Sequence, residues 1–218
     1  MADDLHHQAE RRERWEEAYR EGRRSMSLRR WRIRRLLDVD RDSLIVEVGC
    51  GDGLNLEVLR GIGYRRVLGL EYSPALLAGL PQGRLVAGDA TALPLADCSA
   101  DALFFDSVLH HLTDYLAAAR ETARVLRPGG RVFCFEPRAS GFRDLLDRVT
   151  RSPLAPWVPG LRGRPRTLAE EWELYSAWLV EEPRMGRHFE AAGLRRRYRK
   201  TGPISVFLSY EKPASGAA

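Results

Sequence analysis

The chain has 218 residues, of which 44% are hydrophobic and 30% charged, and its 35 basic and 30 acidic side chains give a formal net charge of +5. This length suits one domain with its own core, and no apolar run approaches the ~18 residues that a membrane-spanning helix needs. The three cysteines, Cys50, Cys98 and Cys134, are too few and too far apart for a disulfide framework. Together with an acidic N-terminus that lacks an apolar signal core, they predict a cytoplasmic protein.

The first predicted element is a helical segment over residues 1–38. Apolar residues with helical spacing lie on both sides of a break at Gly22 and Ser25, namely Trp15, Ala18 and Tyr19, then Ile33, Leu36 and Leu37. Residues 11–35 contain eleven Arg and four Glu, a net charge of +7, so the rest of the chain is net −2. A basic segment of this kind could meet an anionic substrate, an acidic membrane surface or RNA.

Residues 39–137 alternate short apolar runs with helical stretches. Strands are predicted at 44–48, 67–70, 85–87, 102–105 and 131–135, and helices at 54–60, from about 74, and at 115–126. Such alternation predicts a doubly wound α/β fold, with a mostly parallel sheet covered by helices on both faces.

Residues 138–182 interrupt this alternation. Six Pro and Gly residues between 153 and 165 predict an irregular stretch. The capping-box pattern at 167–170 then predicts a helix whose apolar face holds Leu168, Trp172, Tyr175 and Leu179. We interpret 138–182 as an insertion that caps the acceptor side. Residues 183–212 are predicted to form a last helix and two strands, at 194–200 and 205–211, and 213–218 a disordered tail.

Polar residues follow the first three predicted strands, at the edge of the sheet where ligands bind in such folds. Gly49, Gly51 and Gly53 let the chain turn sharply and leave no side chain between the loop and a ligand. Glu71 ends the second strand, where a carboxylate can accept both hydroxyls of a ribose, and Asp89 follows the third, where it can accept an adenine amino proton. These positions predict a pocket for an adenosine with a charged tail. The glycines run G-x-G-x-G rather than the G-x-G-x-x-G of dinucleotide-binding oxidoreductases, which disfavours that class.

Four motifs in this order resemble those of the class I S-adenosylmethionine-dependent methyltransferases. They are Val-Glu-Val-Gly-Cys-Gly-Asp-Gly at 46–53, Leu-Glu-Tyr-Ser at 70–73, the 88–112 region with Gly-Asp-Ala at 88–90 and Leu-His-His-Leu at 109–112, and Val-Leu-Arg-Pro-Gly-Gly-Arg at 125–131. The similarity covers roughly residues 40–137 and is greatest to the small-molecule branch that includes quinone-biosynthesis and natural-product enzymes. It implies a Rossmann-like sheet of seven strands with a reversed last strand.

The resemblance also implies roles for single residues around S-adenosyl-L-methionine. The implied contacts are Glu47, Gly49, Cys50, Gly51 and Gly53 for the methionine end, Glu71 and its neighbour Tyr72 for the ribose, and Asp89 and Ala90 for the adenine. The end of the fourth strand, at Asp106 and Ser107, would border the methyl group.

Two side chains near that point are candidates for proton transfer. His111 suits a general base near neutral pH, and Asp106 is the second catalytic candidate. A structural role is the alternative for both, and for the neighbouring His110 it is preferred. No Cys/His cluster has the spacing of a metal site.

The sequence therefore predicts an S-adenosylmethionine-dependent methyltransferase acting on a small molecule. Two alternatives remain: an RNA methyltransferase that uses the basic N-terminal segment, and a non-catalytic module that binds the cofactor. Residues 106–109 lack the Asn/Asp-Pro-Pro-aromatic motif of enzymes that methylate base amines, which counts against nucleic acid.

Overall fold

The structure, a computed structural model, describes residues 26–79, 84–153, 155–157 and 172–214. The first predicted N-terminal helix with Trp15 and Tyr19, the capping box at 167–170 and most of the predicted tail lie outside the described residues. Among those that are described, no helix is long and apolar enough to cross a membrane.

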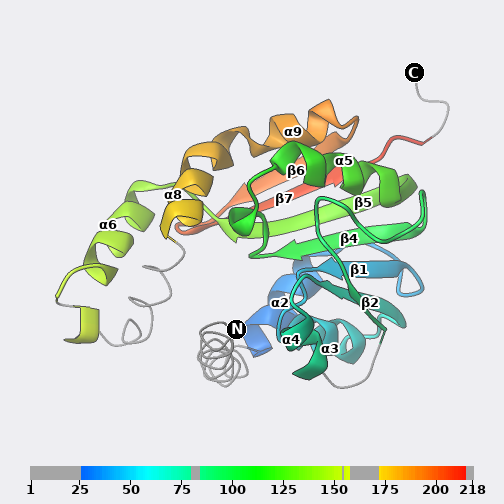
Figure 1. Cartoon of the computed structure of the whole chain (residues 1–218), viewed down its shortest axis with the longest axis horizontal. Helices are drawn as coiled ribbons and strands as arrows, with labels where there is room; N and C mark the ends of the chain where they lie inside the picture. The colour runs from blue at the N-terminus through cyan, green and yellow to red at the C-terminus, as the bar shows by residue number, and fades with distance from the viewer. Residues whose placement is uncertain (1–25, 80–83, 154, 158–171, 215–218) are drawn as a thin grey trace, which may run out of the picture.

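A seven-stranded sheet with the order β3-β2-β1-β4-β5-β7-β6 forms the centre of the fold (Figure 1). Only β7 runs antiparallel to its neighbours β5 and β6, while the pairs among β1 to β5 are parallel. The doubly wound fold with a reversed last strand is thus confirmed. The strands are β1 Leu44–Val48, β2 Arg66–Glu71, β3 Leu85–Ala87, β4 Ala100–Asp106, β5 Leu126–Pro137, β6 Arg195–Thr201 and β7 Ser205–Glu211.

Helices cover both faces of this sheet because successive strand side chains point to opposite faces. One buried cluster joins Val46 and Val48 of β1 to α5, α8 and α9. The other joins Ile45 to α2 and α3. The α-helices are α2 Met26–Leu36, α3 Leu54–Gly61, α4 Pro74–Gly79, α5 Tyr115–Val125, α6 Gly141–Thr150, α8 Trp172–Glu181 and α9 Met185–Ala191, and the 3₁₀ turns are η1 Leu109–His111, η2 Ala155–Trp157 and η3 Glu182–Arg184.

The observed elements follow the predicted ones closely except at β5 and at α6. This strand was expected over 131–135 but begins directly after α5 and runs for 12 residues. The pairing of β5 with β4 shifts between Ala100 and Ala102, so the Pro-Gly-Gly sequence at 128–130 lies where the register changes. Gly129 and Gly130 there exchange backbone hydrogen bonds with Lys212.

Helix α6 lies within 138–182 and is not among the predicted elements, whereas the irregular stretch expected over 153–165 lies mostly outside the described residues. Ser140 caps this helix, its side chain accepting a hydrogen bond from the Arg143 N–H at 3.1 Å. Figure 1 shows α6 projecting beyond the sheet at the left, while α8 lies close to the end of β5. There the Trp178 Nε1 donates to the Pro137 carbonyl at 2.8 Å.

Candidate functional site

The site lies where the strand order reverses. From β1 the chain continues outward to β2 and β3 on one side, and then crosses back to β4 on the other side of β1. Val48 at the end of β1 is level with Leu70 in β2 and with Phe105 in β4. The residues that follow these three positions therefore converge at one edge of the sheet, which is where open α/β folds bind ligands.

The glycine loop after β1 has a backbone that other residues rarely adopt. Gly49, Gly51 and Gly53 have φ values of 71°, 49° and 72°, in the left-handed region that favours glycine. A Cβ at Gly49 would lie 2.5 Å from the Val108 Cγ2, so this glycine also lets the segment after β4 approach. The Gly49 and Cys50 N–H groups both donate to the Leu70 carbonyl, at 2.7 and 2.9 Å, which fixes the loop against β2.

Glu71 at the end of β2 holds the same loop. Its Oε2 accepts from the Gly51 N–H at 2.9 Å, and its Oε1 accepts from the Ser73 N–H at 3.0 Å. Each carboxylate oxygen can accept a second hydrogen bond. The side chain is therefore fixed in place with capacity left for a bound hydroxyl. Its neighbour Tyr72 points outward and is 75% exposed.

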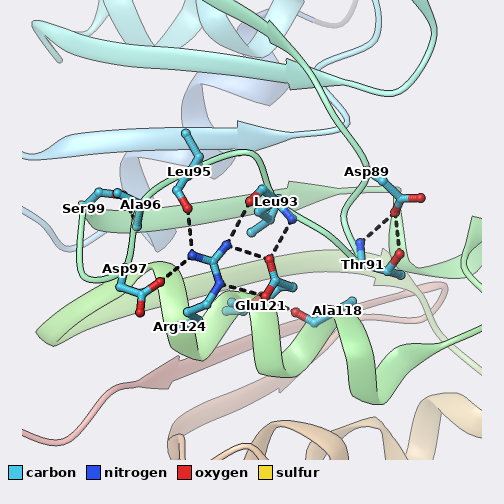
Figure 2. A network of polar contacts seen from close by, with 11 residues as sticks. Asp89, Thr91, Leu93, Leu95, Ala96, Asp97, Ser99, Ala118, Glu121 and Arg124 are labelled. Carbon is cyan, nitrogen blue, oxygen red and sulfur yellow. Dashed lines mark hydrogen bonds and ion pairs between the residues drawn. The ribbon is translucent and has the colours of Figure 1, made fainter.

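Asp89 begins the loop between β3 and β4. Its Oδ1 accepts from the Thr91 N–H and from the Thr91 hydroxyl, both at 2.7 Å. Figure 2 shows the other carboxylate oxygen pointing away from this network. Ala90, the second residue predicted to contact adenine, is buried, with 7% of its surface exposed.

An arginine on α5 holds the remainder of that loop (Figure 2). The Arg124 guanidinium donates to the Leu95 carbonyl at 2.8 Å and to the Leu93 carbonyl at 2.9 Å. Glu121 pairs with Arg124 at 2.7 Å and accepts from the Leu93 N–H at 2.8 Å. These contacts join the segment that carries Asp89 to the helix layer.

Glu47 is a buried acid at the end of β1, only 2% exposed. Its Oε1 accepts from the Asn55 Nδ2 at 2.8 Å, whereas its Oε2 is buried without a hydrogen-bond partner among the described residues. Burial raises the pKa of Glu47 well above its ordinary value, and the Asn55 hydrogen bond opposes that rise. A buried acid with one oxygen unpaired is suited to receive a cationic group.

Asp106, one of the two catalytic candidates, forms a charge cluster with two arginines of α2. Its Oδ2 pairs with the Arg32 guanidinium, accepts from Asn55 at 2.8 Å and lies 3.6 Å from the Arg29 Nη1. The Nε atoms of Arg29 and Arg32 are buried without a partner among the described residues. This edge of the sheet therefore combines an unpaired acid oxygen with unpaired guanidinium donors, a set that matches the ammonium and carboxylate of an amino acid.

Glu136 organises the segment after β4. This fully buried carboxylate accepts from the Val108 and Leu109 N–H groups, each at 2.8 Å, and its Oε2 lies 2.8 Å from the His110 Nδ1. The contact with Glu136 is compatible with a structural role for His110, which stays a prediction. Ser107 just before has a φ of 62°, a strained conformation for a residue with a side chain.

His111, the other catalytic candidate, lies next to His110, with 4.1 Å between the ring centroids. His111 is exposed as a whole residue, but desolvation of its ring and then His110 lower the pKa of His111 to about 4. The imidazole is therefore neutral at physiological pH and able to accept a proton, but it is a weaker base than a free histidine. Its role stays a prediction, as do those of the other site residues.

Four polar residues of this edge were missed by the sequence analysis: Arg29, Arg32, Asn55 and Glu136. Glu136 was visible as a single acid ending an otherwise apolar strand. The arginines were counted only as part of the basic segment, although their spacing of three residues puts both on one helix face. No sequence pattern marked Asn55, because its role depends on how α3 lies against β1 and β4.

A cavity of about 450 Å³ lies elsewhere, between α8, the start of α5 and α9. It is lined by Leu112, Thr113, Tyr115, Leu174, Ala177, Glu181 and His188, and none of the predicted site residues is among them. In the part of the chain that the structure describes, no three His, Cys, Asp or Glu side chains could hold a metal ion.

Comparison with known proteins relates this site to one family. Residues 46–134 match the family model described as a methyltransferase domain. The demethylmenaquinone methyltransferase of Bacillus cytotoxicus is 30% identical over 183 residues, covering 74% of this chain and 74% of that protein. The demethylmenaquinone methyltransferase of Mycobacterium sp. (strain KMS) is 35% identical over 133 residues, covering 59% of this chain and 57% of the relative.

A solved structure is similar over a longer stretch. The putative S-adenosylmethionine-dependent methyltransferase of Methanococcus maripaludis superposes with a TM-score of 0.62, covering 88% of this chain and 86% of that one. The two sequences are 18% identical, so this likeness shows the fold alone.

Proposed function

The chain belongs to the S-adenosylmethionine-dependent methyltransferases, and we propose that S-adenosylmethionine binds at the edge formed by Glu47, the glycine loop, Glu71 and Asp89. We also propose that the methyl acceptor is a quinol-type small molecule. One observation carries the cofactor assignment. Three carboxylates, Glu47, Glu71 and Asp89, lie at or just beyond the carboxyl ends of three neighbouring strands, and Glu71 in the middle is bonded to the left-handed glycine loop at Gly51.

The unpaired atoms at this edge support the fit of the cofactor. The Glu47 Oε2 and the Arg29 and Arg32 Nε atoms are buried without partners among the described residues. Such groups are costly to leave unsatisfied, and an amino-acid zwitterion carries the ammonium and carboxylate that would satisfy them. The Glu71 oxygens retain capacity for ribose hydroxyls, and the outward oxygen of Asp89 for an amino group.

When bound, the cofactor supplies an electrophilic methyl group on a positively charged sulfur. The chain contributes mainly position and a fixed electrostatic environment. Asp106 and its arginines lie at the end of β4, and the strained Ser107 and the Glu136 bonds fix the direction in which the chain leaves that strand. His111, neutral at physiological pH because of its lowered pKa, is the candidate to take a proton from the acceptor.

The acceptor class rests on the relatives named above, which are demethylmenaquinone methyltransferases. Demethylmenaquinone is a quinone, and its reduced ring offers an electron-rich carbon beside hydroxyl groups. The proposal is that this chain methylates a ring of that kind. We further propose a cytoplasmic location. The three cysteines are free, two of them buried, and free cysteines are compatible with a reducing compartment.

The test is transfer of a radiolabelled methyl group by the full chain, with a short-chain reduced naphthoquinone as one acceptor and total RNA as the other. We expect labelled quinone and unlabelled RNA. Labelled RNA without labelled quinone would overturn the acceptor proposal. Calorimetry with S-adenosylhomocysteine tests the cofactor site separately, and absence of heat at millimolar ligand would overturn that assignment.

A further inference from the structure

Helix α6 buries its polar face and exposes its apolar face, the reverse of the usual arrangement. Arg143, Asp147 and Thr150 are 6%, 5% and 1% exposed. The Arg143 Nη2 donates to the Ile204 carbonyl at 2.6 Å, and the Asp147 Oδ2 accepts from the Tyr175 hydroxyl at 2.9 Å. Among the described residues, these polar contacts attach the buried face of α6 to the segment just before β7 and to α8.

The opposite face of α6 is apolar and open to solvent. Phe142 and Leu145 are 57% and 58% exposed, and the spacing puts Leu146 and Val149, both half-buried, on the same stripe. Shortly after α6, Trp157 of η2 is 83% exposed. Exposed side chains of this size are typical of a surface that binds something apolar.

Helix α2 presents a second surface of the same kind. Leu28 and Trp31 are 63% and 59% exposed and lie three residues apart. The helix carries five arginines and no acid, and while Arg29 and Arg32 reach Asp106, the other three are exposed: Arg30, Arg34 and Arg35.

Both surfaces adjoin the carboxyl-end edge of the sheet. α2 reaches Asp106 at the end of β4, and α6 follows the end of β5, its cap Ser140 donating to the Pro203 carbonyl before β7. Figure 1 shows α6 at the far left of the view and α2 below the sheet, near the middle. Of seven exposed large hydrophobic side chains in the described residues, five lie on α2, α6 and η2, and we call these five the apolar rim: Leu28, Trp31, Phe142, Leu145 and Trp157.

The charge around the apolar rim is strongly positive. Four arginines on α2 and α6 are exposed, whereas Asp144 is the one exposed acid that the described part of these two helices carries. The exposed arginines are Arg30, Arg34, Arg35 and Arg148. Exposed aromatic and aliphatic side chains among arginines form the pattern of a protein that lies on an anionic bilayer.

We propose that the apolar rim and its arginines dock this protein on the surface of a bilayer that contains anionic phospholipid, with the cofactor edge facing the membrane side. Aliphatic side chains such as Leu28 and Leu145 cannot stack on bases, which favours lipid over RNA for this surface. Docking of this kind requires no span, and it goes beyond the methyl transfer proposed above.

The test is sedimentation of the full chain with vesicles of phosphatidylcholine alone or mixed with phosphatidylglycerol. We expect binding to the mixed vesicles that weakens with salt. The double change Phe142→Ser and Leu145→Ser should reduce the partition coefficient by about tenfold or more, because it removes two apolar side chains that would insert into the bilayer. Val180→Ser is the matched control, since Val180 on α8 is 70% exposed but lies outside the apolar rim.

Arg30→Gln, Arg34→Gln and Arg35→Gln combined should abolish the preference for phosphatidylglycerol. The triple change of Arg60, Arg66 and Arg120 to Gln, exposed arginines on other elements, should leave that preference in place. Circular dichroism and S-adenosylhomocysteine binding check that the apolar double variant remains folded, so this test can fail while the cofactor proposal holds.

Four outcomes would overturn the proposal. The first three are absence of binding to mixed vesicles, an equal loss in the control and rim variants, and a dimer in sedimentation velocity that the double Ser variant dissociates. The third result would assign the apolar rim to a second copy of the chain. Tight RNA binding that depends on the arginines but not on Phe142 and Leu145 would likewise assign the basic surface to nucleic acid.

Discussion

Glu71 combines two tasks at the end of β2, because its oxygens hold the Gly51 and Ser73 N–H groups while retaining lone pairs for a ligand. A single carboxylate therefore sets the shape of the glycine loop and the position of the predicted ribose. This double use explains why the acid is only 8% exposed although it belongs to a binding edge.

The variant Glu71→Ala should weaken S-adenosylhomocysteine binding by about 1–3 kcal/mol, the usual cost of losing hydrogen bonds to a charged group. Calorimetry measures this change directly, and thermal unfolding of the same sample detects any loss of the loop. Glu173→Ala, at an exposed acid of α8, is the control. Unchanged affinity in the Glu71 variant would contradict the ribose assignment.

His111 makes a prediction about pH. Burial lowers its pKa to about 4, so the ring is neutral above that pH and becomes protonated only below it. If His111 is the base, its titration should cause no inflection in kcat near the ordinary histidine pKa of about 6.5. The value of kcat should fall through protonation of His111 only as the pH approaches 4.

Substitution separates this role from a structural one. We expect His111→Ala to lose most of its turnover with little change in S-adenosylhomocysteine affinity. His188→Ala, at a histidine paired with Glu181 at 3.0 Å, should keep both. Full activity in the His111 variant would leave the residue a packing role.

At the level of single elements, the loop between β3 and β4 depends on α5. Arg124 donates to two loop carbonyls and pairs with Glu121 and Asp97 (Figure 2). Hydrogen bonding to Arg124 lowers the pKa of Glu121. The planar guanidinium can span these acceptors at once, whereas a lysine ammonium cannot reproduce that fork.

Arg124→Lys should therefore lower the free energy of unfolding by about 1–3 kcal/mol and weaken S-adenosylhomocysteine binding through displacement of the Asp89 loop. Urea unfolding and calorimetry measure the two effects. The control is Arg120→Lys, an exposed arginine one turn earlier on the same helix. Wild-type stability together with wild-type affinity in Arg124→Lys would show that the Arg124 guanidinium does not hold the loop.

The elements also show how far the sequence predicts the structure. The strands of the parallel sheet were predicted because each is a short apolar run bounded by turn residues, and Gly49, Glu71 and Asp89 were predicted because they directly follow such runs. Helix α6 is not among the predicted elements, although Phe142, Leu145 and Val149 have helical spacing. That spacing indicates a helix, but it does not indicate that the polar face, with Arg143 and Asp147, is the buried one.

The charge cluster could not be predicted for a different reason. Arg32 meets Asp106 across 74 residues of sequence, and Glu136 meets His110 across 26. Local patterns carry no information on such pairs, because they arise from the way α2 crosses the ends of the strands and from the register of β4 and β5.

For the molecule as a whole, Glu47 of β1, whose Oε2 has no partner among the described residues, links stability to pH and to ligand binding. Burial raises the pKa of Glu47 well above its ordinary value, so the folded state binds this proton more tightly than the unfolded state does. The stabilisation is complete at low pH and is lost as the pH rises through the folded-state pKa. A cationic group that pairs with the carboxylate would restore it.

Wild type should therefore lose stability relative to Glu47→Gln as the pH rises, because the amide carries no charge to bury. Urea unfolding at several pH values measures this difference, and subtraction removes the opposite contribution of His111, whose lowered pKa costs stability as the pH falls. Saturating S-adenosylhomocysteine, which carries the ammonium, should stabilise wild type more than Glu47→Gln, and increasingly so at higher pH. A pH-independent difference between the two proteins, with equal stabilisation by the ligand, would show that Glu47 neither titrates with folding nor receives the ammonium.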